Sequence, residues 1–299
     1  MMLPRVSIVI PIFNRGHVLE SLFESLNKQT FKNFEVVFVD DASAEPIAAS
    51  LHTFKADFQY TLVVNEQNRG VSFSRNAGIN ASRGEYLAFL DSDDLWSEAK
   101  LEKQLSKCLD CEGTVFSMTQ SQVLRNGYVE YLPSHSPDIT ASGQDYILSN
   151  GGFAQVSSFL ISKELASSIG FDNELSQYED YLFFMHAFNQ CDNFIYINEP
   201  LVIWDDRDSK DRLSGMKEFK RALIFYERIK MDFSKKHACF FINRFVAPYH
   251  FYDSPIFFLK NFYFSLRYYS SSITGVTWSC IKSILGSSII GKIRRVYKS

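Results

Sequence analysis

The stretch Tyr86-Leu87-Ala88-Phe89-Leu90-Asp91-Ser92-Asp93-Asp94 is an apolar run that ends in three carboxylates. The run has the length of one buried strand, and carboxylates at its end cannot be buried unless a partner or a cation balances them. Hard oxygen ligands at the carboxyl end of a strand suit Mg²⁺ or Mn²⁺ that also holds a diphosphate. The alternative is a solvated acidic turn that caps a helix beginning near Trp96.

Strand and helix patterns alternate through the first third of the chain. Continuous apolar runs predict strands over 6–10, 34–39, 60–64 and 86–90, and helical spacing predicts helices over 18–26 and 71–81. Repeated strand–helix units are typical of an α/β fold with a mostly parallel sheet flanked by helices. Ligands of such sheets bind beyond the carboxyl ends of the strands, where the polar clusters of this chain lie.

Farther along, strand patterns follow one another without helices between them. The pattern predicts a helix over 101–109, strands over 114–118, 122–125, 128–132 and 156–161 with a hairpin at Asn126-Gly127, and a helix over 179–189. From about Met216 the chain reads as helical. We therefore expect a catalytic α/β domain over 1–215 and a basic, aromatic-rich helical extension over 216–299.

Charge is divided unevenly between these two parts. Residues 1–215 carry a net charge of −14 and residues 216–299 one of +11. Basic helices rich in aliphatic side chains suit an anionic membrane surface, whereas nucleic-acid binding is disfavoured because the basic residues are spread along those helices. The alternatives are packing on the catalytic domain and a homodimer surface at the aromatic stretch 249–269. The apolar residues of the last helical pattern are Ile273, Val276, Cys280, Ile281, Ile284, Leu285, Ile289, Ile293 and Val296.

The cysteines and the hydropathy pattern indicate the compartment. The five cysteines are irregularly spaced, no secretory signal precedes the first strand, and no stretch reaches the roughly 18–20 apolar residues of a spanning helix. Cys108 and Cys111 lack the second pair of ligands that structural zinc needs. We expect a cytoplasmic protein that is peripheral on the inner face of the cell membrane.

The order of the polar motifs resembles the family 2 glycosyltransferases, which are inverting, nucleotide-sugar-dependent enzymes with a GT-A fold. The resemblance spans about residues 4–210 and points to the bacterial surface-polysaccharide type. Five motifs in the right order are a far more specific signal than any one of them. The segments that carry it are Val6–Arg15, Val39–Ser43, Asn68–Gly70 with Ser74–Gly78, Phe89–Asp94, and Glu179-Asp180.

The resemblance implies where the nucleotide-sugar donor binds. In the family, the first Asp of the pair after the second strand accepts a hydrogen bond from the uracil imide. The resemblance therefore assigns that role to Asp40. The alternative is that Asp40 or Asp41 caps the next turn. Arg75 neutralises phosphate or orients Asp91, unless it is an ordinary surface arginine. The expected donor-binding set is Pro11, Phe13, Asn14, Arg15, Asp40, Asn68, Arg75, Asp91 and Ser92.

The resemblance also divides the work among the carboxylates. Asp91 holds ribose or a metal-bound water, and Asp93 ligates a divalent cation, Mn²⁺ or Mg²⁺, that bridges the diphosphate and acts as a Lewis acid for the leaving group. Inversion needs one general base on the face opposite that group. The family pattern assigns this role to Asp180, with Glu179 contacting donor sugar or acceptor; the alternative is that both acids merely favour the positive end of a helix.

One stretch departs from the family pattern. Many relatives carry a histidine about 25 residues after the Glu-Asp pair, whereas this chain reads Leu201–Asp208 there without one. A histidine metal ligand is therefore not expected. Trp204 and Arg207 are expected to serve instead, by stacking on the sugar and binding phosphate.

These features predict transfer of a sugar, from UDP-hexose or UDP-N-acetylhexosamine, to a hydroxyl of a glycan acceptor. A lipid-diphosphate-linked oligosaccharide of O-antigen or capsule synthesis would explain the basic extension. One alternative is a nucleotidyltransferase, but the loop Phe13-Asn14-Arg15-Gly16 is poor in the glycine that a triphosphate loop needs. The other is a sugar-nucleotide-binding or scaffold protein without turnover.

Overall fold

The computed structural model describes residues 3–149, 152–207, 219–250 and 254–268. These residues form two compact units, the first comprising Met1–Gly143 with Gly152–Lys210 and the second comprising Gln144–Gly151 with Asp211–Ser299. The boundary expected at residue 215 falls in the segment 208–218, outside the described residues. The second unit also takes in a short segment, Gln144–Gly151, from the middle of the chain.

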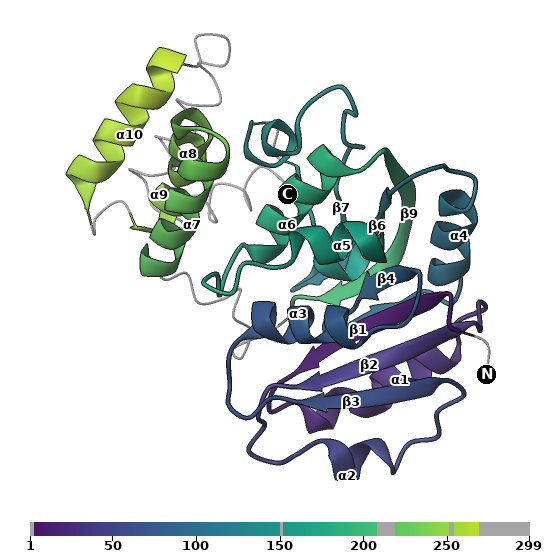
Figure 1. The fold of residues 1–299 in the computed structure, drawn as a ribbon. Helices are drawn as coiled ribbons and strands as arrows, with labels where there is room; N and C mark the ends of the chain where they lie inside the picture. The colour runs from purple at the N-terminus through teal and green to yellow at the C-terminus, as the bar shows by residue number, and fades with distance from the viewer. Residues whose placement is uncertain (1–2, 150–151, 208–218, 251–253, 269–299) are drawn as a thin grey trace. The chain divides into compact units, whose positions relative to one another are not determined.

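The first unit is built on a sheet whose strand order is β3-β2-β1-β4-β8-β6-β9-β5, with β7 paired to β6 (Figure 1). Its parallel part consists of β1 (Val6–Ile12), β2 (Phe34–Asp40), β3 (Gln59–Val64) and β4 (Tyr86–Phe89). The alternating pattern predicted all four of these strands. Because they are parallel, their carboxyl ends lie at one edge of the sheet.

Beyond β4 the sheet gains antiparallel pairs, and of these the sequence pattern indicated only the β6–β7 hairpin. Strand β8 (Phe159–Ser162) is antiparallel to β4 and β6, and β9 (Asn193–Asp205) is parallel to β6 and antiparallel to β5. The expected strands over 114–118 and 122–125 are one strand, β6 (Val115–Arg125), which pairs with β7 (Tyr128–Leu132) as expected. Strand β5 (Asp94–Trp96) is too short for a periodic signal, and an irregularity between Ile197 and Pro200 hides β9.

The two faces of β1 are covered by different helices. Val6, Ile8 and Ile10 share a buried cluster with the apolar face of α1 (Leu19–Asn27). On the opposite face α3 (Val71–Ala81) packs against β1 and β2, and a Cβ at Gly78 would lie 2.3 Å from a methyl group of Val9. The remaining described helices of the first unit are α2 (Ala48–Leu51), α4 (Lys100–Cys108), α5 (Lys163–Ile169), α6 (Glu179–Gln190) and two 3-10 turns (Gly16–Val18 and Val156–Ser158).

A cluster of phenylalanines holds α6 against the sheet. The ring of Phe183 on α6 stacks on Phe171 with centroids 4.2 Å apart, and Phe89 at the end of β4 meets both rings edge-on at 5.2 and 5.6 Å. Phe184 on the same helix contacts Phe116 of β6 at 5.6 Å. Such rings bury large areas in specific geometries, so the cluster sets the position of the first residues of α6.

The described residues of the second unit form helices, and the helical extension expected over 216–299 stays a prediction beyond them. The elements of this unit are a π-helical segment (Asp145–Ser149), α7 (Phe219–Asp232), α8 (Lys235–Phe241), a second π-helical segment (Ile242–Val246), α9 (Ala247–His250) and α10 (Pro255–Tyr268). Phe225 and Phe241 pack edge-on in its core at 4.7 Å. In the part of the chain that the structure describes, no helix has the length and hydropathy that crossing a bilayer requires. The apolar pattern expected over 273–296 lies outside the described residues.

The turn that joins α3 to β4 has no room for a side chain at Gly84. A Cβ there would lie 2.6 Å from the backbone nitrogen of Ser7 and 2.8 Å from the carbonyl carbon of Val6. We expect Gly84→Ala to lower the free energy of unfolding by about 1–3 kcal/mol because the backbone itself must shift. A Cβ at Gly16 would have its nearest neighbour, the Ser50 hydroxyl, 3.8 Å away. Gly16→Ala should therefore change the free energy of unfolding by less than about 1 kcal/mol. Urea denaturation of both variants measures the difference, and equal midpoints would contradict the steric argument.

Candidate functional site

The loops that follow β1 and β2 are joined by hydrogen bonds. The backbone N–H of Asn14 donates to the Ser43 hydroxyl at 2.9 Å, and the Ala44 N–H donates to the Asn14 side chain at 2.8 Å. Phe13 is 43% exposed beside them, whereas Pro11 is buried within β1 opposite Val39. Of the residues expected to meet the base and ribose, Phe13 and Asn14 therefore lie at the surface of the edge, and Pro11 lies inside the sheet.

The two acids after β2 are held in different ways. Asp40 is 1% exposed, and its carboxylate accepts the N–H groups of Ser43 at 2.9 Å and Ile47 at 3.2 Å. This geometry favours the turn-capping role that the sequence left open, and the uracil contact of Asp40 stays a prediction. Asp41 accepts from the side chain of Asn65 at 2.7 Å and from the Gly70 N–H at 2.8 Å, which ties β2 to the start of α3.

Arg75 joins the two acidic motifs that the sequence placed 88 residues apart. Its guanidinium is buried and donates to Asp91 at 2.7 Å and to Glu179 at 2.9 Å. Burial alone would lower the pKa of Arg75, but these two carboxylates outweigh it, so the pKa is raised and the charge is kept. The alternative of an ordinary surface arginine is wrong, since Arg75 is 2% exposed. Its orienting contact with Asp91 agrees with one of the two expected roles.

Asp93 forms an ion pair with Arg15 from the loop after β1. Asp93 and Asp91 remain partly exposed, with side chains 21% and 33% accessible, while Ser92 between them is buried. Among the described residues no group of three or more His, Cys, Asp or Glu side chains could hold a metal by itself. Two carboxylates nevertheless fit Mg²⁺ or Mn²⁺, which proteins commonly hold through one or two carboxylates plus substrate phosphates.

A buried network beneath this loop was not found by sequence reasoning. The Ser157 hydroxyl donates to Asp94 at 2.6 Å and accepts the Asp91 N–H at 3.1 Å, while Gln155 donates to Asp94 at 2.8 Å. Asp94 is thereby paired although it is 2% exposed. No motif marks Ser157 or Gln155, because they approach from a distant stretch of chain. Asn65 could have been found, since it is a polar residue directly after a predicted strand.

Asp180 has an environment suited to accepting a proton. Burial raises the pKa of this carboxyl well above its usual range, and the neighbouring Glu179 raises it further, while Arg75 and the Tyr181 N–H act in the opposite direction. The Tyr181 N–H lies 2.8 Å from the carboxylate. A carboxylate with a raised pKa is a more effective general base near neutral pH than an ordinary aspartate.

Three residues of the described chain, other than glycine, have a positive φ, and all three flank the candidate site. They are Asn14 at 53°, Ala42 at 61° and Tyr178 at 66°. Each costs free energy that the surrounding contacts must supply, and such residues cluster at functional sites. Tyr178 directly precedes Glu179 and Asp180 at the start of α6.

The structure places the remaining expected residues around this edge with different partners. Trp204 lies opposite Asp94 in the β5–β9 pair, and its ring stacks with Phe153 at 5.8 Å. Arg207 is 55% exposed in its side chain and pairs with Asp205 at 2.7 Å, and Asn68 is exposed on the loop before α3. Their expected contacts with sugar and phosphate stay predictions.

Comparison with known proteins gives consistent similarities. The model of the family described as glycosyl transferase family 2 matches residues 7–170. The amylovoran biosynthesis glycosyltransferase AmsB of Erwinia amylovora is 30% identical over 206 residues, which are 66% of this chain and 68% of AmsB. The Escherichia coli UDP-Glc:alpha-D-GlcNAc-diphosphoundecaprenol beta-1,3-glucosyltransferase WfgD is 36% identical over 104 residues, which are 35% of this chain and 41% of WfgD.

Solved structures show the same fold. The crystal structure of S. aureus TarS 1–349 in complex with UDP-GlcNAc has a TM-score of 0.60 at 21% identity, over 83% of this chain and 73% of TarS 1–349. The complex of the same protein with UDP has a TM-score of 0.58 at 20% identity. At this identity the likeness concerns the fold, and it confirms the GT-A architecture expected from the sequence.

The raised pKa of Asp180 predicts a measurable effect of its neighbour. Glu179→Gln removes a negative charge beside Asp180 and frees Arg75 from one of its partners, and both changes favour the ionised carboxylate. We therefore expect the pKa of Asp180 to fall in this variant, as followed by carboxyl-carbon NMR titration. Glu164→Gln, the same change at an exposed position on α5, is the control. An unchanged pKa in Glu179→Gln would show that Glu179 does not contribute to the raised pKa of Asp180.

Proposed function

Because the chain belongs to glycosyl transferase family 2, and is a glycosyltransferase of the bacterial surface-polysaccharide type, we propose that it transfers one sugar with inversion from a UDP-sugar to a hydroxyl of a lipid-diphosphate-linked oligosaccharide. The observation that carries the proposal is the bridge of Arg75 between Asp91 and Glu179. It supports the proposal because Asp91 and Glu179, joined through one guanidinium, would both lie within reach of one bound molecule.

The choice of donor rests on relatives. WfgD is named for UDP-Glc, and TarS 1–349 has been crystallised with UDP-GlcNAc. We accordingly propose UDP-hexose or UDP-N-acetylhexosamine as the donor of this chain. The exposed Phe13 and Asn14 would meet the base and ribose, and Trp204 and Arg207 would contact sugar and phosphate.

A divalent cation, Mn²⁺ or Mg²⁺, is part of the proposal. Asp93 and Asp91 would hold it, and when bound it would supply charge neutralisation for the departing diphosphate. Both acids are paired with arginines, so Arg15 would release Asp93 and become free to meet a phosphate. Arg75 would keep Asp91 oriented throughout, because it is buried and cannot swing away.

Asp180 would take the proton of the attacking hydroxyl. Inversion is a single displacement, and the base must stand on the side opposite the leaving group. The phenylalanine cluster fixes α6, and the backbone N–H of Tyr181 orients the Asp180 carboxylate. Glu179, held by Arg75, would contact the donor sugar or the acceptor instead of moving a proton.

The acceptor and the location are proposed from charge and from relatives. WfgD is named for an acceptor linked to diphosphoundecaprenol, and TuaG of Bacillus subtilis is named as a putative teichuronic acid biosynthesis glycosyltransferase. The basic C-terminal extension would favour a site at the anionic inner face of the cell membrane, where lipid-linked acceptors lie. O-antigen or capsule synthesis is the setting that fits this combination.

The role of Asp180 is tested by Asp180→Asn. We expect turnover to fall by about 10²–10⁴, the range for loss of a general base, with UDP affinity unchanged. The assay follows UDP release from UDP-glucose and UDP-N-acetylglucosamine, with synthetic polyprenyl-diphosphate-linked N-acetylglucosamine as acceptor. Asp110→Asn, the same substitution at an exposed site, should retain full turnover. Normal turnover in Asp180→Asn would place the base elsewhere.

The metal assignment is tested by calorimetric titration of UDP with and without Mn²⁺. We expect Mn²⁺ to strengthen UDP binding in the native protein and to have no such effect in Asp93→Ala, because one of the two ligands is then missing. GDP in parallel tests the base preference, and Asp110→Ala is the matched control. If Asp93→Ala kept the Mn²⁺ effect, the metal would be bound elsewhere. If the folded native protein bound neither nucleotide, the donor proposal itself would fail.

A further inference from the structure

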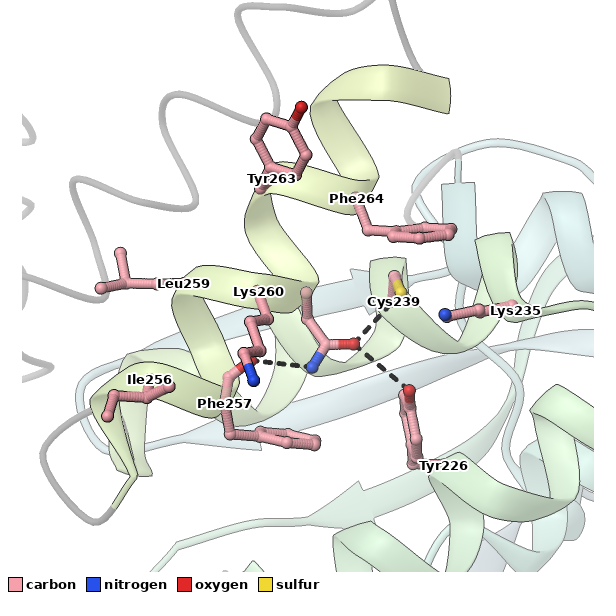
Figure 2. Close-up of a pocket in the computed structure, with 10 residues that line it drawn as sticks. Tyr226, Lys235, Cys239, Ile256, Phe257, Leu259, Lys260, Tyr263 and Phe264 are labelled. Carbon is pink, nitrogen blue, oxygen red and sulfur yellow. Dashed lines mark hydrogen bonds between the residues drawn. The ribbon is translucent and has the colours of Figure 1, made fainter.

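The second unit contains a cavity of about 600 Å³ whose wall is built from α7, α8 and α10 (Figure 2). Most of its lining is apolar, and α10 contributes aromatic and aliphatic side chains along its length. A cavity of this size falls within the range of small-molecule sites. It forms no part of the acidic site described above.

Three polar side chains in this wall, those of Tyr226, Cys239 and Asn261, are hydrogen-bonded to one another. The Asn261 carbonyl accepts from the Tyr226 hydroxyl at 3.3 Å and from the Cys239 thiol at 3.1 Å, and its amide donates to the Phe257 carbonyl at 2.9 Å. These three contacts are the dashed lines in Figure 2. The wall therefore offers a ligand mainly apolar contact rather than neutral hydrogen-bonding groups.

Two lysines are the exceptions. Lys235 and Lys260 both line the cavity, and no acidic residue lies in the lining. The Lys235 ammonium lies 4.0 Å from the centroid of the Phe264 ring, and within the described part of the chain neither lysine has a carboxylate partner. Positive groups beside an apolar wall without acids complement a ligand that has an apolar body and an anionic end.

Three apolar residues of α10 that line the cavity are also widely exposed. Ile256 is 71% exposed, Leu259 54% and Tyr263 68%, and their spacing puts them on one face of the helix. A contiguous apolar patch at the rim of a cavity is typical of a binding surface. A ligand in the cavity would therefore lie along this face of α10.

We propose that this cavity binds the isoprenoid chain of the lipid-linked acceptor, with its diphosphate close to Lys235 and Lys260. The inference rests on the proposed function, since the acceptor named there joins a long apolar chain to a diphosphate. The alternative occupants of the same face are the acyl chains of a bilayer and a second copy of the chain. The experiment separates them from the isoprenoid.

The test titrates farnesyl diphosphate, a short isoprenoid diphosphate, into the full-length protein by calorimetry. We expect saturable binding to the native protein. Binding should weaken by about tenfold or more in Leu259→Glu, because a carboxylate then faces the apolar chain. It should weaken as much in the double variant Lys235→Gln/Lys260→Gln, because the charge pairing with the diphosphate is lost. Met231→Glu adds the same charge at an apolar, 70% exposed position outside the cavity, and Lys220→Gln removes a lysine outside it. Both controls should bind as the native protein does.

Each contrary outcome has a definite meaning. Equal farnesyl diphosphate binding in Leu259→Glu and Met231→Glu overturns the proposed site. A native protein that binds UDP but not farnesyl diphosphate also overturns it, but leaves the transferase proposal standing. Farnesyl diphosphate binding without UDP binding would instead support the cavity and reject the donor proposal. If Leu259→Glu abolishes only flotation with anionic phospholipid vesicles, or only self-association, the face is a bilayer or dimer contact and the isoprenoid inference fails.

Discussion

The buried ion-pair bridge through Arg75 is the constraint on which the site depends. One guanidinium, 2% exposed, neutralises Asp91 at the end of β4 and Glu179 at the start of α6. Removing one member of a fully buried ion pair typically costs about 3–5 kcal/mol, and solvent access to Asp91, whose side chain is 33% accessible, lowers that cost here. The Nε of Arg75 has no hydrogen-bond partner among the described residues. The role of this arginine therefore depends on its charge and on the two terminal nitrogens that bind the acids.

The remaining structure supports this bridge from both sides. The rings of Phe171 and Phe183 stack on each other and hold α6 against β4. The Arg75 guanidinium carbon lies 5.1 Å from the centroid of the Phe171 ring. Ser157 holds the other side by joining the Asp91 N–H to the Asp94 carboxylate. Tyr178, which directly precedes α6, has a strained positive φ. This conformation agrees with a helix whose position is fixed by its aromatic contacts, because the preceding residue must then adopt the φ that connects the chain to it.

The parallel strands and the 71–81 helix were predictable because their apolar periodicity is set by burial that every such sheet requires. The strands that were missed lack such periodicity: β5 is three residues long, and β9 has its pattern broken near Pro200. In the site, the acids and Arg75 were predicted from motif order, whereas Ser157 and Gln155 were not. Their residue types are common, and only the return of β8 beside β4 brings them under the acidic loop.

The sequence by itself determined the α/β class, the positions of the acidic clusters at strand ends and the uneven distribution of charge, because composition and periodicity are local properties. The tertiary structure decided which carboxylates are paired and which are accessible. Asp40 and Asp41 look alike in the sequence, yet one caps a turn and the other ties β2 to α3. The raised pKa of Asp180 likewise depends on burial and on charges brought from distant segments, and these exist only once the chain has folded.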